Sequence, residues 1–136
     1  MPASWIARCS MFAALALLVS SVPAAAQARA IASRPSHAAQ LKSALRSVAA
    51  AQARHHAATS AYAASMEPLR LPPAPGVQVE ILAAGRSGWQ ARARHQEQPG
   101  RSCVIFVGRL DNEAPRTDGD REMAGEEGVP LCDRMR

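Results

Sequence analysis

The sequence is poor in aromatic residues and in lysine. Its 136 residues include two Phe, two Trp and one Tyr, and one of the tryptophans, Trp5, lies within the first 28 residues. Proteins that bind single-stranded nucleic acid stack bases on interleaved aromatic side chains, and so few aromatic residues leave no such platform. Lys42 is the one lysine among 16 basic residues, so arginine supplies nearly all the positive charge. Because alanine is abundant too, GC-rich coding explains that arginine content as readily as function does.

Sequence patterns of enzymatic chemistry are also missing. The serines lie in small-residue runs without a Gly-x-Ser-x-Gly elbow, and the four histidines have no recognisable nucleophile partner. His55 and His56 are neighbours, and adjacent side chains on a helix point about 100° apart, so they cannot chelate one metal ion as an i, i+4 pair does. Glu126 and Glu127 lie in a glycine-flanked loop. We therefore expect no catalytic residues, no cofactor and no enzyme.

Residues 1–28 carry the pattern of a secretory signal peptide. Arg8 supplies positive charge near the amino terminus, and residues 11–19 (MFAALALLV) form an uninterrupted apolar run. Pro23 and the small residues around it then end the run. A basic start, an apolar centre and a small-residue end are the three parts of a secretory leader. The sequence therefore predicts a secreted or periplasmic protein.

The cleavage site follows from the small residues at the end of the leader. We expect cleavage after Ala28, with Ala26 and Ala28 as the small pair; cleavage after Ala26 is the alternative. A membrane-spanning helix needs about 20 apolar residues, and Ser20 and Ser21 interrupt the run too early, although an uncleaved anchor remains an alternative. Cys9 precedes the apolar run, which disfavours a lipoprotein. No stable membrane insertion is expected after cleavage.

Removal of the leader leaves two cysteines, Cys103 and Cys132. In an oxidising compartment such a pair indicates a disulfide. Closing a loop of about 30 residues stabilises a fold by roughly 3 kcal/mol in chain-entropy models. Free or metal-bound thiols are the alternative, but two sulfurs without further ligands make a poor zinc site.

The net charge of +5 is unevenly distributed. Residues 29–109 hold eleven basic and three acidic side chains, and residues 110–136, the acidic tail, hold four basic and eight acidic ones. Two interpretations follow. The acidic tail folds back as a counter-charge, or the basic body meets polyanions such as DNA or anionic surface polymers.

Residues 37–58 predict an alanine-rich amphipathic helix after a flexible lead-in over residues 29–36. One stripe recurs at three- and four-residue spacing, and its members are Leu41, Leu45, Val48, Gln52 and His55. Ser36 supplies an N-cap. Residues 70–76 (RLPPAPG) contain three prolines, which exclude a helix or a central strand, and predict an extended connector.

Beyond the connector the hydrophobic period falls to two, which predicts strands over residues 77–84, 88–96 and 102–108. Short turns join them, as in an antiparallel meander. Trp89 is expected on the side that faces the helix. The predicted fold class is α+β: a single domain over residues 37–136, in which one long N-terminal helix packs on three antiparallel strands and a disulfide closes the C-terminal loop.

Two groups of side chains in this domain are candidate binding residues. Arginines in a row suit phosphate contacts, and the candidates for binding a polyanion are Arg86, Arg92, Arg94 and Arg101. Calcium prefers carboxylates on irregular loops, and the candidate ligands are Asp111, Asp118 and Asp120. A solvated basic face and a solvated acidic loop are the respective alternatives, and the spacing of an EF-hand is absent.

The order of these segments resembles a known family. Residues 41–69 (LKSALRSVAAAQARHHAATSAYAASMEPL) carry Ala-Ala-Gln, then His, then Tyr-Ala; residues 88–95 (GWQARARH) are a Trp-led strand, and residues 101–108 (RSCVIFVG) bear a cysteine. They are similar to the second half of the first helix and the sheet of type IV pilins and pseudopilins, and a terminal cysteine that pairs back to the last strand fits as well. The resemblance implies a pilin-like fold and a structural or interaction role at the cell envelope. Some pseudopilins bind calcium near the C-terminal end of this domain.

The chain departs from the family at its start. Type IV prepilins carry a Gly-Phe-type processing site and a glutamate shortly after it, whereas the first glycine here is Gly76 and the first acid is Glu67. The apolar half-helix that would pack a filament is therefore missing or removed. This implies a pilin-like domain freed from the filament, whose partner is an unknown envelope protein or surface polymer. The alternatives are a polyanion- or DNA-binding accessory protein and a membrane-tethered minor pseudopilin with an uncleaved leader.

Overall fold

The computed structural model describes residues 34–136. In chain order the elements are α2 (His37–Thr59), the 3-10 helix η1 (Glu67–Leu69), β1 (Val77–Ala84), β2 (Gly88–His95), β3 (Ser102–Gly108) and β4 (Leu131–Cys132). The expected signal peptide and its cleavage site at Ala26 and Ala28 lie outside the described residues. Within residues 34–136, no helix combines the length and the hydropathy that a membrane span requires.

The strands form one antiparallel sheet in the order β1-β2-β3-β4. The expected three-stranded meander is therefore corrected to a four-stranded sheet. In β4 only two residues pair with β3, and Cys132 lies opposite Cys103. A strand of two residues shows no alternation of apolar and polar side chains, so the sequence pattern gives no sign of it. The three longer strands agree with the predicted ranges to within one residue.

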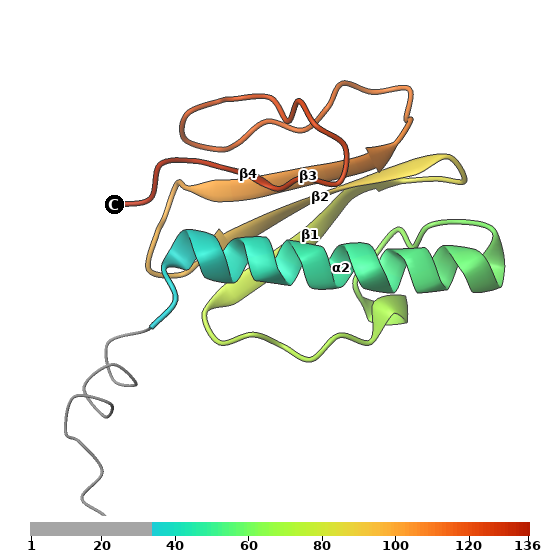
Figure 1. Ribbon diagram of the computed structural model, residues 1–136, viewed down its shortest axis with the longest axis horizontal. Coiled ribbons are helices and arrows are strands. Elements are labelled where there is room, and N and C mark those ends of the chain that lie inside the picture. Colours follow the sequence, from blue (N-terminus) through green and yellow to red (C-terminus); the bar gives the residue numbers. More distant parts are fainter. Residues whose placement is uncertain (1–33) are drawn as a thin grey trace, which may run out of the picture. The chain divides into compact units, whose positions relative to one another are not determined.

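Helix α2 lies along one side of this sheet (Figure 1). The Ser36 hydroxyl caps its start by accepting the Ala39 N–H at 3.2 Å, as the sequence predicts. The residues of the helix that face the sheet are buried: Leu41, Leu45, Val48, Ala51 and Gln52. They pack against one face of β2 and β3, formed by Trp89, Ala91, Ala93, Cys103 and Ile105. The core therefore sits between one helix and one sheet, with small alanines on β2 that admit the helix closely.

Gln52 joins the helix to the chain that follows it. Its side chain has no exposed surface. It donates from Nε2 to the Ala63 carbonyl and accepts the Ala63 N–H at Oε1, each at 2.8 Å. Because both backbone groups of Ala63 are paired in this way, the segment beyond the helix is fixed without a regular element.

The disulfide between Cys103 and Cys132 is present, as predicted from the cysteine count. It joins directly opposed residues of β3 and β4 and spans 29 positions of sequence. The bond therefore anchors the end of the acidic tail to the sheet.

Replacing Gln52 by Met would keep the volume of the side chain but remove both hydrogen bonds to Ala63. We expect the free energy of unfolding to fall by about 3 kcal/mol, because a buried donor and a buried acceptor lose their partner. Urea unfolding measures this change. Gln40→Met is the control, since the Gln40 amide donates to the Pro35 carbonyl at the surface and its loss costs less than about 1 kcal/mol. Equal effects of the two changes would contradict the role given to Gln52.

Candidate functional site

The two faces of β2 have different coverings. Ala91 and Ala93 point into the core with α2. Because side chains alternate along a strand, Arg92 and Arg94 point to the opposite face. The acidic tail lies over that face (Figure 1). The candidate arginines thus lie beneath a segment of opposite charge.

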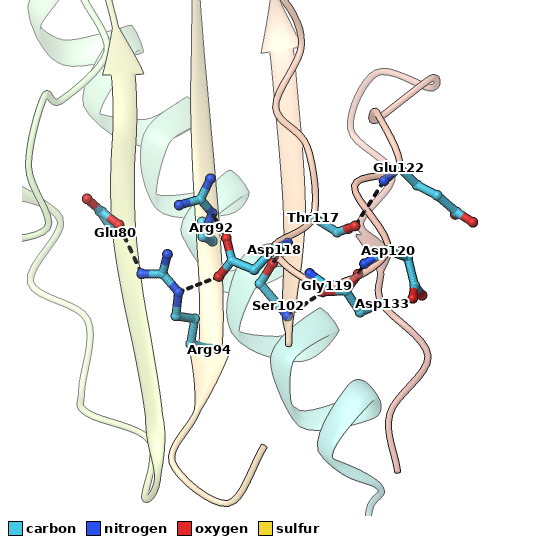
Figure 2. Close-up of polar contacts among 10 residues, drawn as sticks. All are labelled: Glu80, Arg92, Arg94, Ser102, Thr117, Asp118, Gly119, Asp120, Glu122 and Asp133. Atoms are coloured by element: carbon cyan, nitrogen blue, oxygen red, sulfur yellow. Dashed lines mark hydrogen bonds and ion pairs between the residues drawn. The ribbon is translucent and has the colours of Figure 1, made fainter. Parts of the chain in front are cut away.

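Asp118 bridges the two arginines of β2 (Figure 2). Its Oδ2 accepts a hydrogen bond from Arg94 Nε at 2.6 Å, and its Oδ1 lies 3.2 Å from Arg92 Nε. The contact to Arg92 is an ion pair without hydrogen-bond geometry. Glu80 on β1 lies 3.4 Å from Arg94 Nη1. The hydrogen bond that Arg94 donates to Asp118 is the main cause that raises the pKa of Arg94 above its usual value.

A second ion pair lies between Asp120 and Arg101. Asp120 Oδ1 accepts from Arg101 Nη1 at 2.8 Å, and Oδ2 accepts the Arg134 N–H at 2.9 Å. The Arg134 N–H and, after it, Arg101 hold the pKa of Asp120 below its usual value, against the effect of burial. The two segments approach closely at Gly119, where an added Cβ would lie 3.0 Å from the Gly100 carbonyl oxygen.

Asp133 holds the acidic tail together from the inside. It is 3% exposed. Oδ2 accepts the Ser102 N–H at 2.8 Å and the Gly119 N–H at 2.9 Å, while Oδ1 accepts the Asp120 N–H at 2.6 Å. Burial by itself raises the pKa of Asp133, but these bonds and one from the Thr117 hydroxyl outweigh it and lower the pKa. A single carboxylate therefore connects β3, the middle of the acidic tail and its end.

The sequence-predicted arginines fall into three places. Arg92 and Arg94 come together at Asp118, and Arg101 lies at Asp120. Arg86 is exposed in the turn between β1 and β2, where its carbonyl accepts from His56 Nε2 at 3.0 Å. The uneven charge had two interpretations, and these ion pairs agree with the one in which the acidic tail folds back and neutralises the basic body. Binding of a polyanion stays a prediction.

The candidate calcium ligands do not come together. Asp118 and Asp120 direct their oxygens to arginines, and Asp111 lies in an exposed stretch just after β3. Among residues 34–136, these three carboxylates form no cluster with the spacing of metal ligands. Calcium binding therefore remains a sequence-based hypothesis without a ligand cluster in this part of the chain.

A group of possible metal ligands that no sequence motif predicted lies at the C-terminal end of β2, on the helix-facing side of the strand. It consists of His37, His95 and Glu97, whose ligand atoms all lie within 4.8 Å of one another. His37 is the first residue of α2, and His95 is the last residue of β2. Because His37 and His95 are far apart in the sequence, no short motif predicts the group. The alternation along β2 predicts only that His95 lies on the helix-facing side.

His55 and His56 diverge, as expected of neighbours on a helix. The His56 ring stacks on Tyr62, with ring centroids 4.3 Å apart, and donates to the Arg86 carbonyl. His55 is half-buried and lies outside that contact. The two rings do not share a metal-ligand cluster within the described residues.

Comparison of the sequence with models of protein families and with curated proteins gives no match. The observed helix, antiparallel sheet and terminal disulfide are compatible with a pilin-like α+β fold.

The lowered pKa values of Asp120 and Asp133 make stability depend on acid pH. Each folded-state pKa lies below the unfolded value, so both carboxylates contribute fully above about pH 4, and their contribution is lost as pH falls through the folded values. We expect the free energy of unfolding to decline below about pH 4. Asp133→Asn should lower stability at neutral pH by about 3 kcal/mol, as for lost hydrogen bonds to a charged group, and should flatten that decline.

Urea unfolding of both proteins between pH 2 and pH 7 measures this effect. Glu126→Gln is the matched control, because Glu126 is exposed in the same tail. An Asp133→Asn protein with the stability and acid profile of the parent would refute the role assigned to Asp133.

Proposed function

We propose that this chain is an exported, non-enzymatic, pilin-like module of the cell envelope that binds another envelope protein or a surface polymer. The observation that carries the proposal is the combination of one capped helix on an antiparallel sheet with a cysteine near the C-terminus bonded back to β3. The same order of elements and the same cysteine pairing underlie the resemblance of the sequence to type IV pilins and pseudopilins.

The outer face of α2 supports a domain that stands apart from a filament. The helix has one buried stripe, and that stripe already lies on the sheet. The exposed positions along its middle are small or basic: Ser43, Arg46, Ser47, Ala50, Ala53 and Arg54. A helix in a filament core needs a second apolar face with large side chains, whereas the exposed face of α2 carries only small and basic ones.

The disulfide supports export. Disulfides form and persist in secreted and periplasmic proteins and are rare in the reducing cytosol. The leader-like residues 1–28 point to the same compartment.

The polyanion-binding alternative would use the arginine face, which is formed by Arg92, Arg94 and Arg101. These arginines would have to exchange their present partners for phosphates. Phosphates would have to displace Asp118 from Arg92 and Arg94, and Asp120 from Arg101. Carboxylates already tied to the same loop hold those positions at high effective concentration. The alternative with an uncleaved leader keeps the same domain but fixes it to the membrane.

The proposal is tested by the mass of the chain after export. Expressed with its own leader in a bacterial host, the protein should be recovered from the periplasm or the medium. We expect an intact mass for a chain that begins at Arg29, reduced by two hydrogens for the Cys103–Cys132 bond. Leu17→Arg, which breaks the apolar run of the leader, should keep the chain in the cytoplasm with reduced cysteines and is the control.

Two outcomes would contradict the proposal. Recovery of the unprocessed parent chain from the cytoplasm, with Cys103 and Cys132 both reduced, would rule out export. An oxidised chain that keeps Met1 and remains in the membrane fraction would replace the free module by the tethered pseudopilin.

A further inference from the structure

We propose that His37, His95 and Glu97 form a binding site for a divalent transition-metal ion, with zinc as the preferred ion. The inference is independent of the proposed function, because it uses neither the leader, nor the arginine face, nor the disulfide. The three residues are the one group among residues 34–136 whose His, Asp, Glu or Cys ligand atoms converge to metal-binding distances.

The ligands come from segments that the fold brings together. His37 begins α2, His95 ends β2, and Glu97 lies in the turn between β2 and β3. One ring nitrogen of each histidine and one carboxylate oxygen lie within 4.8 Å of one another. Two histidines and a glutamate are an established zinc ligand set, which leaves a fourth position for water or another ligand.

His95 is held in a fixed place within the group. It is 7% exposed, and its Nδ1 accepts the Glu97 N–H at 3.2 Å. The ring also lies against Gly76, which has φ +74°; an added Cβ there would approach His95 Nε2 to 2.8 Å. The His37 ring also packs on the His95 ring, with centroids 4.2 Å apart. A ring confined by two neighbours loses little freedom on binding an ion.

The two other ligands, His37 and Glu97, already face each other. His37 Nε2 donates to Glu97 Oε2 at 2.8 Å. Two tetrahedral ligands at the usual zinc distances of about 2.0–2.2 Å lie roughly 3.3 Å apart, so a small separation of this pair makes room for the ion. The ion takes the place of the proton on His37 Nε2, and that proton passes through solvent to Nδ1 of the same ring, which leaves a neutral imidazole with a free lone pair on Nε2. The Glu97 side chain is 73% exposed and can make that movement. At His95, the lone pair on Nδ1 accepts the backbone N–H of Glu97 at 3.2 Å, and an ion bound at Nδ1 would replace that hydrogen bond.

The nature of the ligands selects the ion. Imidazole nitrogens favour zinc and neighbouring transition metals, whereas calcium and magnesium take oxygen ligands. Bound zinc would link the first residue of α2 to the turn between β2 and β3. The ion would thereby fix the start of α2 to the sheet. The start of α2 is the N-terminal end of the domain and follows the leader-like residues in the sequence.

The test is a zinc titration of the oxidised protein, produced without a histidine tag. We expect one zinc ion per chain by isothermal titration calorimetry, a higher unfolding temperature with zinc, and no equivalent effect of calcium. His37→Gln and Glu97→Gln keep hydrogen-bonding groups but remove good ligands. Each should weaken zinc binding by at least about tenfold, the loss that even an outer-shell partner can cause.

His55→Gln is the matched control, because this histidine lies on the same helix but outside the group. It should bind zinc as the parent does. Unfolding temperatures without zinc show that each variant is folded. The proposal is overturned if the parent takes up no zinc, or if His37→Gln and Glu97→Gln bind it unchanged. Loss of binding in His55→Gln would place the ion at His55 and would also overturn the proposal.

Discussion

The last residues of the chain are held against β3 by a covalent bond and, next to it, by a buried carboxylate. Cys132 is bonded to Cys103, and Asp133 accepts the N–H of Ser102, the neighbour of Cys103 in β3. With both ends of the acidic tail attached to β3, the residues between them must form a closed loop over the sheet. Asp133 fixes the course of that loop, because it also accepts backbone N–H groups from the middle of the tail.

This loop determines what the arginine face can meet. Asp118 and Asp120 reach Arg92, Arg94 and Arg101 only because the tail passes over them. Ion pairs that are partly open to water contribute at most about 1 kcal/mol each, while a crosslink of this loop length contributes roughly 3 kcal/mol. The crosslink and the buried carboxylate therefore hold the tail, and the ion pairs neutralise the face that it covers.

Local features were predictable and long-range ones were not. The change of hydrophobic period from about four to two located α2 and three of the strands. Ser36 predicted the N-cap of α2, and Trp89 predicted which side of β2 faces the helix. Strand β4 is too short for a pattern, and it forms only because the chain returns to β3. The pairing of Asp118 with its arginines and the grouping of His37 with His95 depend on residues that meet through the sheet and the loop. No short sequence motif predicts that these side chains lie close together. The uneven charge of the chain did predict, as one of two interpretations, that the acidic tail folds back on the basic body.

Native-state hydrogen exchange before and after reduction of the disulfide tests this account most directly. The informative amides are those of Asp118, Gly119 and Asp120, which donate to Ser102 and Asp133. The account predicts that these amides lose protection when the thiols are free, while the buried positions of α2 keep theirs. Tail amides that stay equally protected in the reduced protein would contradict it.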